Sequence, residues 1–258
     1  MELGLTGKCA LVTGGSQGIG RAIALELARE GCHMAICARR EEALQKTVCE
    51  IEAVGVEALG LVVDVLQPEQ VAAAVDGLLD RWGGVDILVN NVGGEPDWRP
   101  LFEEAPDSIW LEVFEKNLMA AVRFTRGLVP EMEKRGWGRV VSVASLQGRE
   151  GGGRPWYNLS KSAEISLMKT LGMDREMAQA GITFNSIAPG AVLSPGNGWD
   201  RFRVEDPEGF IRKASQRPQG RLGTPEEIAH VVAFICSEKA SLLNGACIPV
   251  DGAESRSF

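Results

Sequence analysis

The only tyrosine of the chain, Tyr157, stands four residues before Lys161. If this segment is helical, the two side chains share one face of the helix, so a phenol lies beside an ammonium group. A phenol has a pKa of about 10, and a neighbouring cation lowers that pKa because it favours the phenolate. The pair is therefore a means of exchanging a proton at neutral pH. On this spacing alone, a packed ring beside a solvated amine is the alternative interpretation.

A glycine-rich segment near the start of the chain is typical of phosphate recognition. It reads Thr-Gly-Gly-Ser-Gln-Gly-Ile-Gly from Thr13 to Gly20 and joins a predicted strand to a predicted helix. Glycine is needed where such a turn bends tightly and approaches a pyrophosphate, and the amino end of the helix attracts the phosphate charges. The spacing GxxxGxG is neither GxGxxG nor a Walker loop, so the strand–turn–helix context carries the prediction of dinucleotide binding. The candidate cofactor-binding residues here are Gly14, Ser16, Gln17, Gly18, Ile19 and Gly20.

The end of the second predicted strand bears on which dinucleotide binds. A carboxylate there would hold the ribose 2′-hydroxyl of NAD, whereas arginine accommodates the 2′-phosphate of NADP. The sequence has Arg39 and Arg40 with no preceding acid, which favours NADP(H) over NAD(H); the alternative is a solvated pair of loop arginines. Asp64, followed by Val65, is a candidate contact for the adenine ring, and it could equally cap a helix.

The rest of the sequence alternates short apolar runs with longer helical patterns, as a parallel sheet with crossover helices requires. We therefore predict an α/β fold: a single-domain, doubly wound (Rossmann-type) parallel sheet of about seven strands with helices on both faces, spanning residues 1–258. The predicted strands are 8–13, 33–37, 59–63, 85–89, 139–143, 182–187 and 246–250, and the predicted helices are 18–29, 41–54, 69–82, 107–135, 155–180 and one from residue 225. The least regular stretches are 93–100, 148–154 and 191–220. We expect them beyond the carboxyl ends of the strands, with 191–220 as the substrate loop.

Composition and charge argue against several other classes of function. The formal net charge of −8 and the isoelectric point of about 5.0 speak against nucleic acid or an anionic membrane as the main partner. No apolar run approaches the ~20 residues of a membrane span, and residues 1–8 lack the basic region and apolar core of a signal peptide. The six cysteines form no CxxC pair, and His33 and His230 are isolated, so we expect no metal site and a reducing, cytoplasmic location.

Taken together, these motifs resemble those of the short-chain dehydrogenase/reductase family, in particular the compact branch that includes 3-oxoacyl-carrier-protein reductases. The resemblance covers essentially the whole chain. The sequence departs from the usual pattern at Val92, where alanine is usual, at Ser194, where threonine is usual, and at Ala253, where glycine is usual. None of these changes removes a catalytic group. The matching segments are residues 13–20, Asp64-Val65, Asn90-Asn91-Val92-Gly93, Asn117, Ser145, Tyr157 with Lys161, Pro189-Gly190 and Val250-Asp251-Gly252.

The resemblance implies a role for each matched residue. Tyr157 would give a proton to a carbonyl oxygen, or act as the base in the reverse direction. Lys161 would lower the pKa of Tyr157 and bind the nicotinamide ribose. Ser145 would hold the substrate oxygen, and Asn117 would help to position a water in a proton relay. Further cofactor contacts would be Asn91, Pro189, Gly190, Val192 and Ser194. The family also implies a homotetramer or a dimer, with helices 107–135 and 155–180 at one interface and the C-terminal strand at another.

Substrate recognition is encoded less sharply. Gln147 is a candidate substrate contact, and it lies with Arg149 and Arg154 between Ser145 and Tyr157. Residues 94–100 and 195–203 mix aromatic side chains with arginines. Arginines suit carboxylate or phosphate groups, and solvated loop arginines are an equal alternative.

We therefore predict an NADP(H)-dependent oxidoreductase that reduces a ketone or a 3-oxoacyl group of a small-molecule substrate, with Tyr157 as general acid. An NAD(H)-preferring alcohol, sugar or steroid dehydrogenase is the alternative enzyme, and Arg39 speaks against it. A non-catalytic dinucleotide sensor is the alternative of another class. The presence of Asn117, Ser145, Tyr157 and Lys161 speaks against a sensor.

Overall fold

Seven parallel strands form the sheet of this protein. The computed structural model describes residues 1–96 and 100–257, and the strand order there is β3-β2-β1-β4-β5-β6-β7, with every pairing parallel. The predicted parallel α/β sheet is confirmed. The strand order reverses between β1 and β4, which is where sheets of this kind bind ligands. The strands are β1 (Cys9–Thr13), β2 (His33–Ala38), β3 (Ala58–Val62), β4 (Ile87–Asn90), β5 (Gly138–Val143), β6 (Ile182–Pro189) and β7 (Cys247–Val250).

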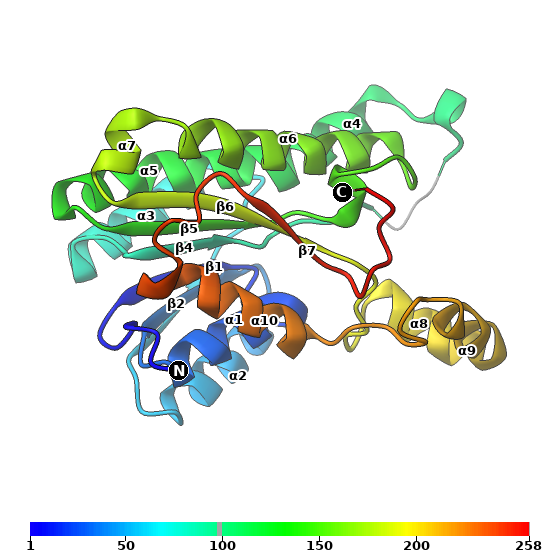
Figure 1. Cartoon of the computed structure of the whole chain (residues 1–258), viewed down its shortest axis with the longest axis horizontal. Coiled ribbons are helices and arrows are strands. Elements are labelled where there is room, and N and C mark those ends of the chain that lie inside the picture. Colours follow the sequence, from blue (N-terminus) through cyan, green and yellow to red (C-terminus); the bar gives the residue numbers. More distant parts are fainter. Residues whose placement is uncertain (97–99, 258) are drawn as a thin grey trace.

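Helices cover both faces of this sheet (Figure 1). One face carries α1 (Gly18–Arg29), α2 (Glu41–Glu52) and α10 (Pro225–Cys236), which bury one apolar cluster against the strands. The other face carries α3 (Pro68–Trp82), α4 (Asp107–Phe114), α5 (Ala120–Arg135) and α6 (Pro155–Gly172). A second buried cluster holds α3, α5 and α6 to the strands. No helix within the described residues is long and apolar enough to cross a membrane.

The helix predicted over residues 107–135 is interrupted by a π-helical turn. This turn, η2 (Glu115–Met119), lies between α4 and α5. Within it, Asn117 donates through Nδ2 to the carbonyl oxygen of Val113 at 2.7 Å, so a side chain competes with the backbone for that carbonyl. Asn117 is thereby held on the inner face of the helix, with only 1% of its surface exposed.

Two further stretches differ from the prediction because capping side chains start new helices. The helix predicted over 155–180 ends at Gly172, and α7 (Arg175–Gln179) begins where the Asp174 carboxylate accepts from two backbone N–H groups. The stretch 191–220, predicted as irregular, contains α8 (Gly198–Glu205) and α9 (Pro207–Ser215). The side chains of Asn197 and Asp206 cap them. Both residues were visible start signals in the sequence.

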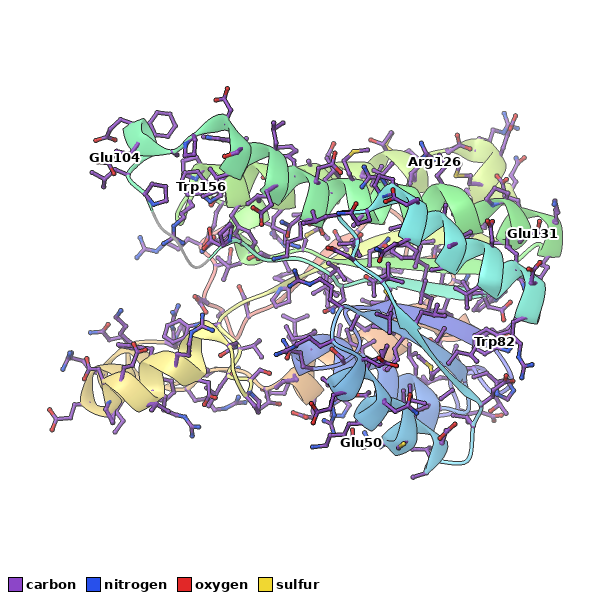
Figure 2. All side chains as sticks on the ribbon, turned by 180° about the vertical axis from the view of Figure 1, so that it is seen from behind. Glu50, Trp82, Glu104, Arg126, Glu131 and Trp156 are labelled. Carbon is purple, nitrogen blue, oxygen red and sulfur yellow. The ribbon has the colours of Figure 1, made fainter. Side chains whose placement is uncertain are left out.

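The loops that follow the strands gather at one end of the molecule. Figure 2 shows Trp156 and Glu104 at this end, and Trp82 and Glu131 at the opposite end. Trp82 closes α3 ahead of β4, so it marks the amino ends of the strands. Trp156 follows the loop after β5 and marks their carboxyl ends. The part of the chain that the structure describes also contains three short 3₁₀ helices: η1 (Phe102–Glu104), η3 (Leu146–Gly148) and η4 (Glu238–Ala240).

Candidate active site

Tyr157 and Lys161 lie on one face of α6, as their spacing predicted. Pro155 occupies the first turn of this helix, where its missing N–H costs nothing. The Tyr157 ring packs beside Trp156, Trp110 and Val113 in a small apolar cluster. Lys161 Nζ lies 5.8 Å from the centroid of the Tyr157 ring.

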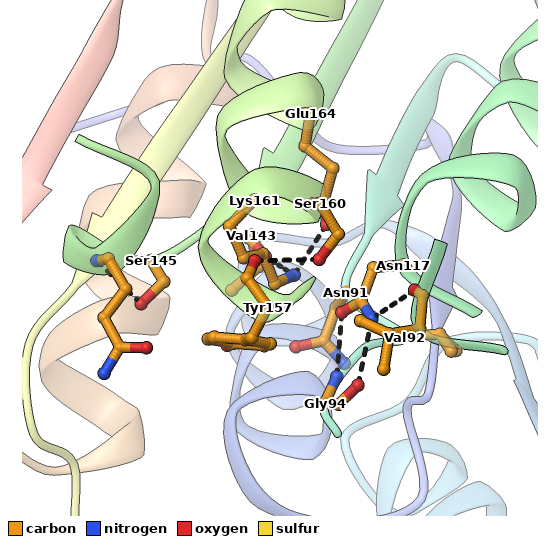
Figure 3. Close-up of polar contacts among 12 residues, drawn as sticks. Asn91, Val92, Gly94, Asn117, Val143, Ser145, Tyr157, Ser160, Lys161 and Glu164 are labelled. Carbon is orange, nitrogen blue, oxygen red and sulfur yellow. Dashed lines mark hydrogen bonds and ion pairs between the residues drawn. The ribbon is translucent and has the colours of Figure 1, made fainter. Parts of the chain in front are cut away.

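The Lys161 amine is almost completely enclosed. Its side chain is 3% exposed, and Nζ donates to the carbonyl oxygen of Val143 at 3.0 Å. It also forms an ion pair of 2.8 Å with Oε1 of Glu164, three residues further along α6. Figure 3 shows the Glu164 side chain reaching from α6 towards this amine, with Tyr157 and Asn117 nearby.

Burial and charge act against each other at these groups. Burial raises the pKa of Tyr157, and the charge of Lys161 lowers it without outweighing burial. The lowering effect predicted for Lys161 is therefore present, but the pKa of Tyr157 lies above its usual value in this structure. Burial alone would lower the pKa of Lys161, yet the charges of Glu164 and Tyr157 raise it, so the amine stays protonated.

Ser145 and Asn117 reach the same region from other elements. Ser145 follows the end of β5 and caps η3, where its Oγ accepts from the Gln147 N–H at 3.2 Å. The Asn117 amide accepts from the Gly94 N–H and donates to the Gly94 carbonyl, both at 2.9 Å. Asn117 thus fixes the loop that follows β4 against η2 (Figure 3). Ser142, a nearby hydroxyl, lies within β5 and is completely buried.

The turn after β1 requires its glycines, and we call Gly14, Gly15, Gly18 and Gly20 the glycine wall. A Cβ on Gly20 would lie 2.4 Å from both Asn91 Nδ2 and the Gly14 carbonyl oxygen. A Cβ on Gly15 would lie 2.5 Å from Ile36 Cγ2. Gly14 and Gly18 have φ of +68° and +59°, which L side chains rarely adopt. Asn91 locks the turn by donating to the Thr13 carbonyl oxygen at 2.8 Å.

The glycine wall leaves the amino end of α1 open to a ligand. Gln17 stands at the N-cap of α1 and makes no side-chain cap hydrogen bond, so it leaves the first N–H groups of the helix to another acceptor. Unpaired N–H groups and the positive end of the helix dipole suit a pyrophosphate. The backbone at this turn therefore fits a dinucleotide.

One cavity of about 900 Å³ connects the glycine wall to Tyr157 and Ser145. Every residue predicted to bind the cofactor lines it. Asn117 and Gln147 do not line it: Asn117 lies behind the Gly94 loop, and Gln147 packs against Gly153. The predicted lining residues are Gly14, Ser16, Gln17, Gly18, Ile19, Gly20, Arg39, Arg40, Asp64, Val65, Asn91, Tyr157, Lys161, Pro189, Gly190, Val192 and Ser194.

The residues of the cavity that follow β2 and β3 are more exposed than Lys161. Arg39 and Arg40 are both exposed at the end of β2, and Arg40 donates to Gln17 Oε1 at 2.5 Å. Asp64 Oδ1 accepts from the Leu66 N–H at 3.1 Å, so its carboxylate closes a turn while it lines the cavity.

Two ion pairs, which we call the substrate rim, lie beside the opposite end of the cavity without lining it. Arg154, before α6, pairs with Glu95 from the loop after β4. Arg217, after α9, pairs with Glu254 near the C-terminus, and its guanidinium lies 5.3 Å from the centroid of the Trp199 ring. Residues 97–99 of the predicted substrate region lie outside the described residues.

Two residues that line the cavity, Glu112 and Lys116, were not predicted from the sequence. Asn197 and Trp199 also line it, and they come from the predicted substrate loop. Glu95 and Arg154 are 59 residues apart in the sequence, so no local pattern predicts that they form a pair. Glu164 did have a signal, because it is an acid three residues after Lys161 on the same helix.

Comparisons with known proteins agree with this geometry. The sequence profile of the family described as short chain dehydrogenase matches residues 8–201. The chain is similar to a 3-oxoacyl-[acyl-carrier-protein] reductase of Pseudomonas aeruginosa, with 38% identity over 253 residues that cover 97% of this chain and 98% of that protein.

Solved structures are similar along the full length. The crystal structure of L-sorbose reductase from Gluconobacter frateurii, complexed with NADPH and L-sorbose, has a TM-score of 0.93 and 37% identity, covering 100% of both chains. A 7α-hydroxysteroid dehydrogenase complexed with NADH and 7-oxo glycochenodeoxycholic acid has a TM-score of 0.87 and 30% identity, covering 99% of this chain and 97% of that one.

Proposed function

The chain belongs to the short-chain dehydrogenase family, and on that premise we propose that it reduces a ketone or a 3-oxoacyl group with NADPH, using Tyr157 as the proton donor. The family makes it an oxidoreductase. The reverse reaction, oxidation of a secondary alcohol, uses the same residues with the proton moving the other way.

One observation carries this proposal. A single cavity is lined at one side by the amino end of α1 and at the other by the Tyr157 phenol, the Ser145 hydroxyl and the Lys161 amine. A dinucleotide whose phosphates meet the glycine wall can therefore extend towards the only tyrosine of the chain.

The residues of the chain supply everything except the hydride. Bound nicotinamide supplies the hydride. Tyr157 donates its proton to the carbonyl oxygen as negative charge develops there, and Ser145 orients that oxygen. Lys161 stabilises the resulting phenolate, because its ammonium is the cation near the ring. Asn117 keeps the Gly94 loop in place above the amine.

The side chains at the end of β2 favour NADP(H). Arg39 and Arg40 border the cavity there, and β2 ends in Ala38 with no carboxylate to hold a ribose 2′-hydroxyl. NAD(H) is the second candidate, because the similar steroid dehydrogenase was solved with NADH. The solved sorbose reductase carries NADPH, which supports the first.

The substrate class follows the relatives and the lining of the cavity. One similar protein is a 3-oxoacyl-carrier-protein reductase and another was solved with a ketose, and both substrates carry a ketone. Lys116 and Asn197 give the substrate side of the cavity polar atoms, and Trp199 adds an aromatic face. We propose small ketones and 3-oxoacyl thioesters as the substrates to test.

We also propose a homodimer or homotetramer in the cytoplasm. Leu111 on α4 and Leu159 on α6 are 67% and 53% exposed, which suits burial against a second copy of these helices. All six cysteines are free thiols, as a reducing compartment requires. Sedimentation of the purified protein would measure the number of subunits.

Parallel fluorescence titrations with NADPH and NADH, followed by turnover on ketones and 3-oxoacyl thioesters, test the function. The proposal expects tighter binding of NADPH and turnover of at least one of these carbonyl classes. Preference for NADH would contradict the assignment of Arg39. Binding without turnover of any carbonyl or alcohol would favour the dinucleotide sensor.

A further inference from the structure

Glu164 is the only buried carboxylate among the described residues. It is 1% exposed, on the inner face of α6 that packs against α4 and η2. An isolated carboxylate at such a position is strongly unfavourable, so a buried acid needs a cation or hydrogen-bond donors. The cation is Lys161, at 2.8 Å.

The geometry makes Glu164 part of a three-group array. Lys161 Nζ lies between the Glu164 carboxylate and the Tyr157 ring, at 2.8 Å from Oε1 and 5.8 Å from the ring centroid (Figure 3). The carbonyl oxygen of Val143, at 3.0 Å, is the other acceptor for this amine. A lysine side chain has many rotamers, so these contacts decide where its charge lies.

Other charged groups face the array from neighbouring elements. Glu95, from the loop after β4, raises the pKa of Tyr157 slightly, and Arg154 neutralises it. Glu112 and Lys116, from α4 and η2, lie along the cavity. Burial raises the pKa of Glu164 to about 7, and the charge and hydrogen bond of Lys161 oppose that increase.

We propose that Glu164 is a positioning residue that holds the Lys161 amine in place as a cation and sets how strongly that cation acts on Tyr157. The inference rests on the proposed role of Tyr157 and Lys161 in proton transfer. Glu164 itself touches neither cofactor nor substrate. It acts by opposing the charge of Lys161, so the phenolate is stabilised less than an unopposed ammonium would allow.

Glu164→Gln tests this with almost no change in shape. Removal of a buried negative charge makes both neighbours more acidic. In alcohol oxidation the rate rises as Tyr157 loses its proton and falls as Lys161 loses its own. We expect both limbs of the pH–rate profile to move to lower pH by about one unit. The control Glu176→Gln, which removes an exposed carboxylate on α7, should leave both limbs in place.

A second readout needs no turnover. Because Tyr157 is the only tyrosine, ¹³Cζ-tyrosine labelling gives a single NMR signal that reports the titration of the pair without assignment. The large shift that marks ionisation of the phenol should occur at lower pH in Glu164→Gln than in the wild type, and the smaller step that the Glu164 carboxyl causes near pH 7 in the wild type should be absent. Superimposable titrations and pH–rate profiles would overturn the proposal.

Glu164→Asp separates charge from position. Aspartate keeps the negative charge, but its side chain is shorter by one methylene and holds the Lys161 amine less firmly. Both limbs of the pH–rate profile should therefore stay near those of the wild type, while kcat falls several-fold. An unchanged kcat would contradict the positioning role even if Glu164→Gln does not fold. If the wild type turned over no carbonyl, the proposed function would be wrong. The NMR comparison would still show whether Glu164 affects the titration of Tyr157 and Lys161.

Discussion

The two borders of the cavity are made by different kinds of interaction. The glycine wall is shaped by backbone geometry: two of its residues have positive φ, and a Cβ on Gly15 or Gly20 would lie within 2.5 Å of neighbouring atoms. The substrate rim is shaped by ion pairs between loops distant in the sequence, Arg154 with Glu95 and Arg217 with Glu254. An ion pair between partly exposed side chains contributes little to stability, so its residues can be substituted at a small cost in free energy. A side chain added where the backbone is crowded costs more, because the surrounding atoms must move.

This difference separates two kinds of specificity. The glycine wall would recognise a pyrophosphate, which is common to every dinucleotide, so its geometry leaves no room for variation. The substrate rim adjoins the end of the cavity near Tyr157 and Trp199, where we propose that the substrate binds. We therefore expect substitutions in the glycine wall to affect folding and cofactor binding together, and substitutions in the rim to affect the reaction with the substrate while cofactor binding stays the same.

The largest effect should come from the glycine wall. Gly20→Ala forces a methyl group to 2.4 Å from Asn91 Nδ2 and the Gly14 carbonyl oxygen. We expect a loss of about 1–3 kcal/mol in the free energy of unfolding and at least tenfold weaker NADPH binding, measured by urea denaturation and fluorescence titration. The control Gly77→Ala lies within α3 with no atom within 4 Å of the new methyl group. It should stabilise the chain by about 0.5–1 kcal/mol, and a Gly20 variant that behaves like this control would contradict the crowding argument.

An intermediate effect is expected where the cofactor meets a side chain. Arg39→Asp replaces a cation beside the cavity with an anion, and a hydrogen bond to a charged group contributes about 1.5–3 kcal/mol. The ratio of NADPH to NADH affinity should therefore fall by about 10- to 100-fold, measured by parallel titrations. Arg175→Asp makes the same charge change on α7 and should leave the ratio unchanged. An unaltered ratio in Arg39→Asp would show that another group holds the 2′-phosphate.

The smallest effect should come from the substrate rim. Arg154→Gln breaks the ion pair with Glu95, whose side chains are 24% and 22% exposed. We expect KM for the carbonyl substrate to change by about two- to fivefold, in line with the ~1 kcal/mol of a partly exposed pair, while NADPH affinity stays the same. Arg81→Gln breaks an Arg–Glu pair at the opposite end of the strands and should change neither value. An altered NADPH affinity in Arg154→Gln would contradict the claim that the substrate rim does not take part in cofactor binding.

The elements that the sequence predicted well are those with local or periodic signals. All seven strands were placed near their observed positions. The central strands are buried and read as continuous apolar runs, whereas the edge strands β3 and β7 are only partly buried. The glycines after β1 and the four-residue spacing of Tyr157 and Lys161 are local patterns. Every predicted cofactor residue lines the cavity, and its role in cofactor binding stays a prediction.

The features that were missed depend on tertiary contacts or on overlooked caps. The Glu95–Arg154 and Arg217–Glu254 pairs join loops that only the fold brings together. The π-helical turn at Asn117 depends on a side chain competing for the Val113 carbonyl. The two helices within 191–220 could have been predicted from Asn197 and from Asp206 followed by proline.

The most direct test is deuterium transfer from NADPH deuterated at both C4 positions to a ketone or 3-oxoacyl substrate, compared between the wild type and Tyr157→Phe. The wild type should place deuterium on the carbinol carbon of the product. Tyr157→Phe should bind NADPH with unchanged affinity and transfer deuterium at least about 10²–10⁴-fold more slowly, because it lacks the proton donor. Transfer by Tyr157→Phe at the wild-type rate would contradict the role of the only tyrosine in the chain.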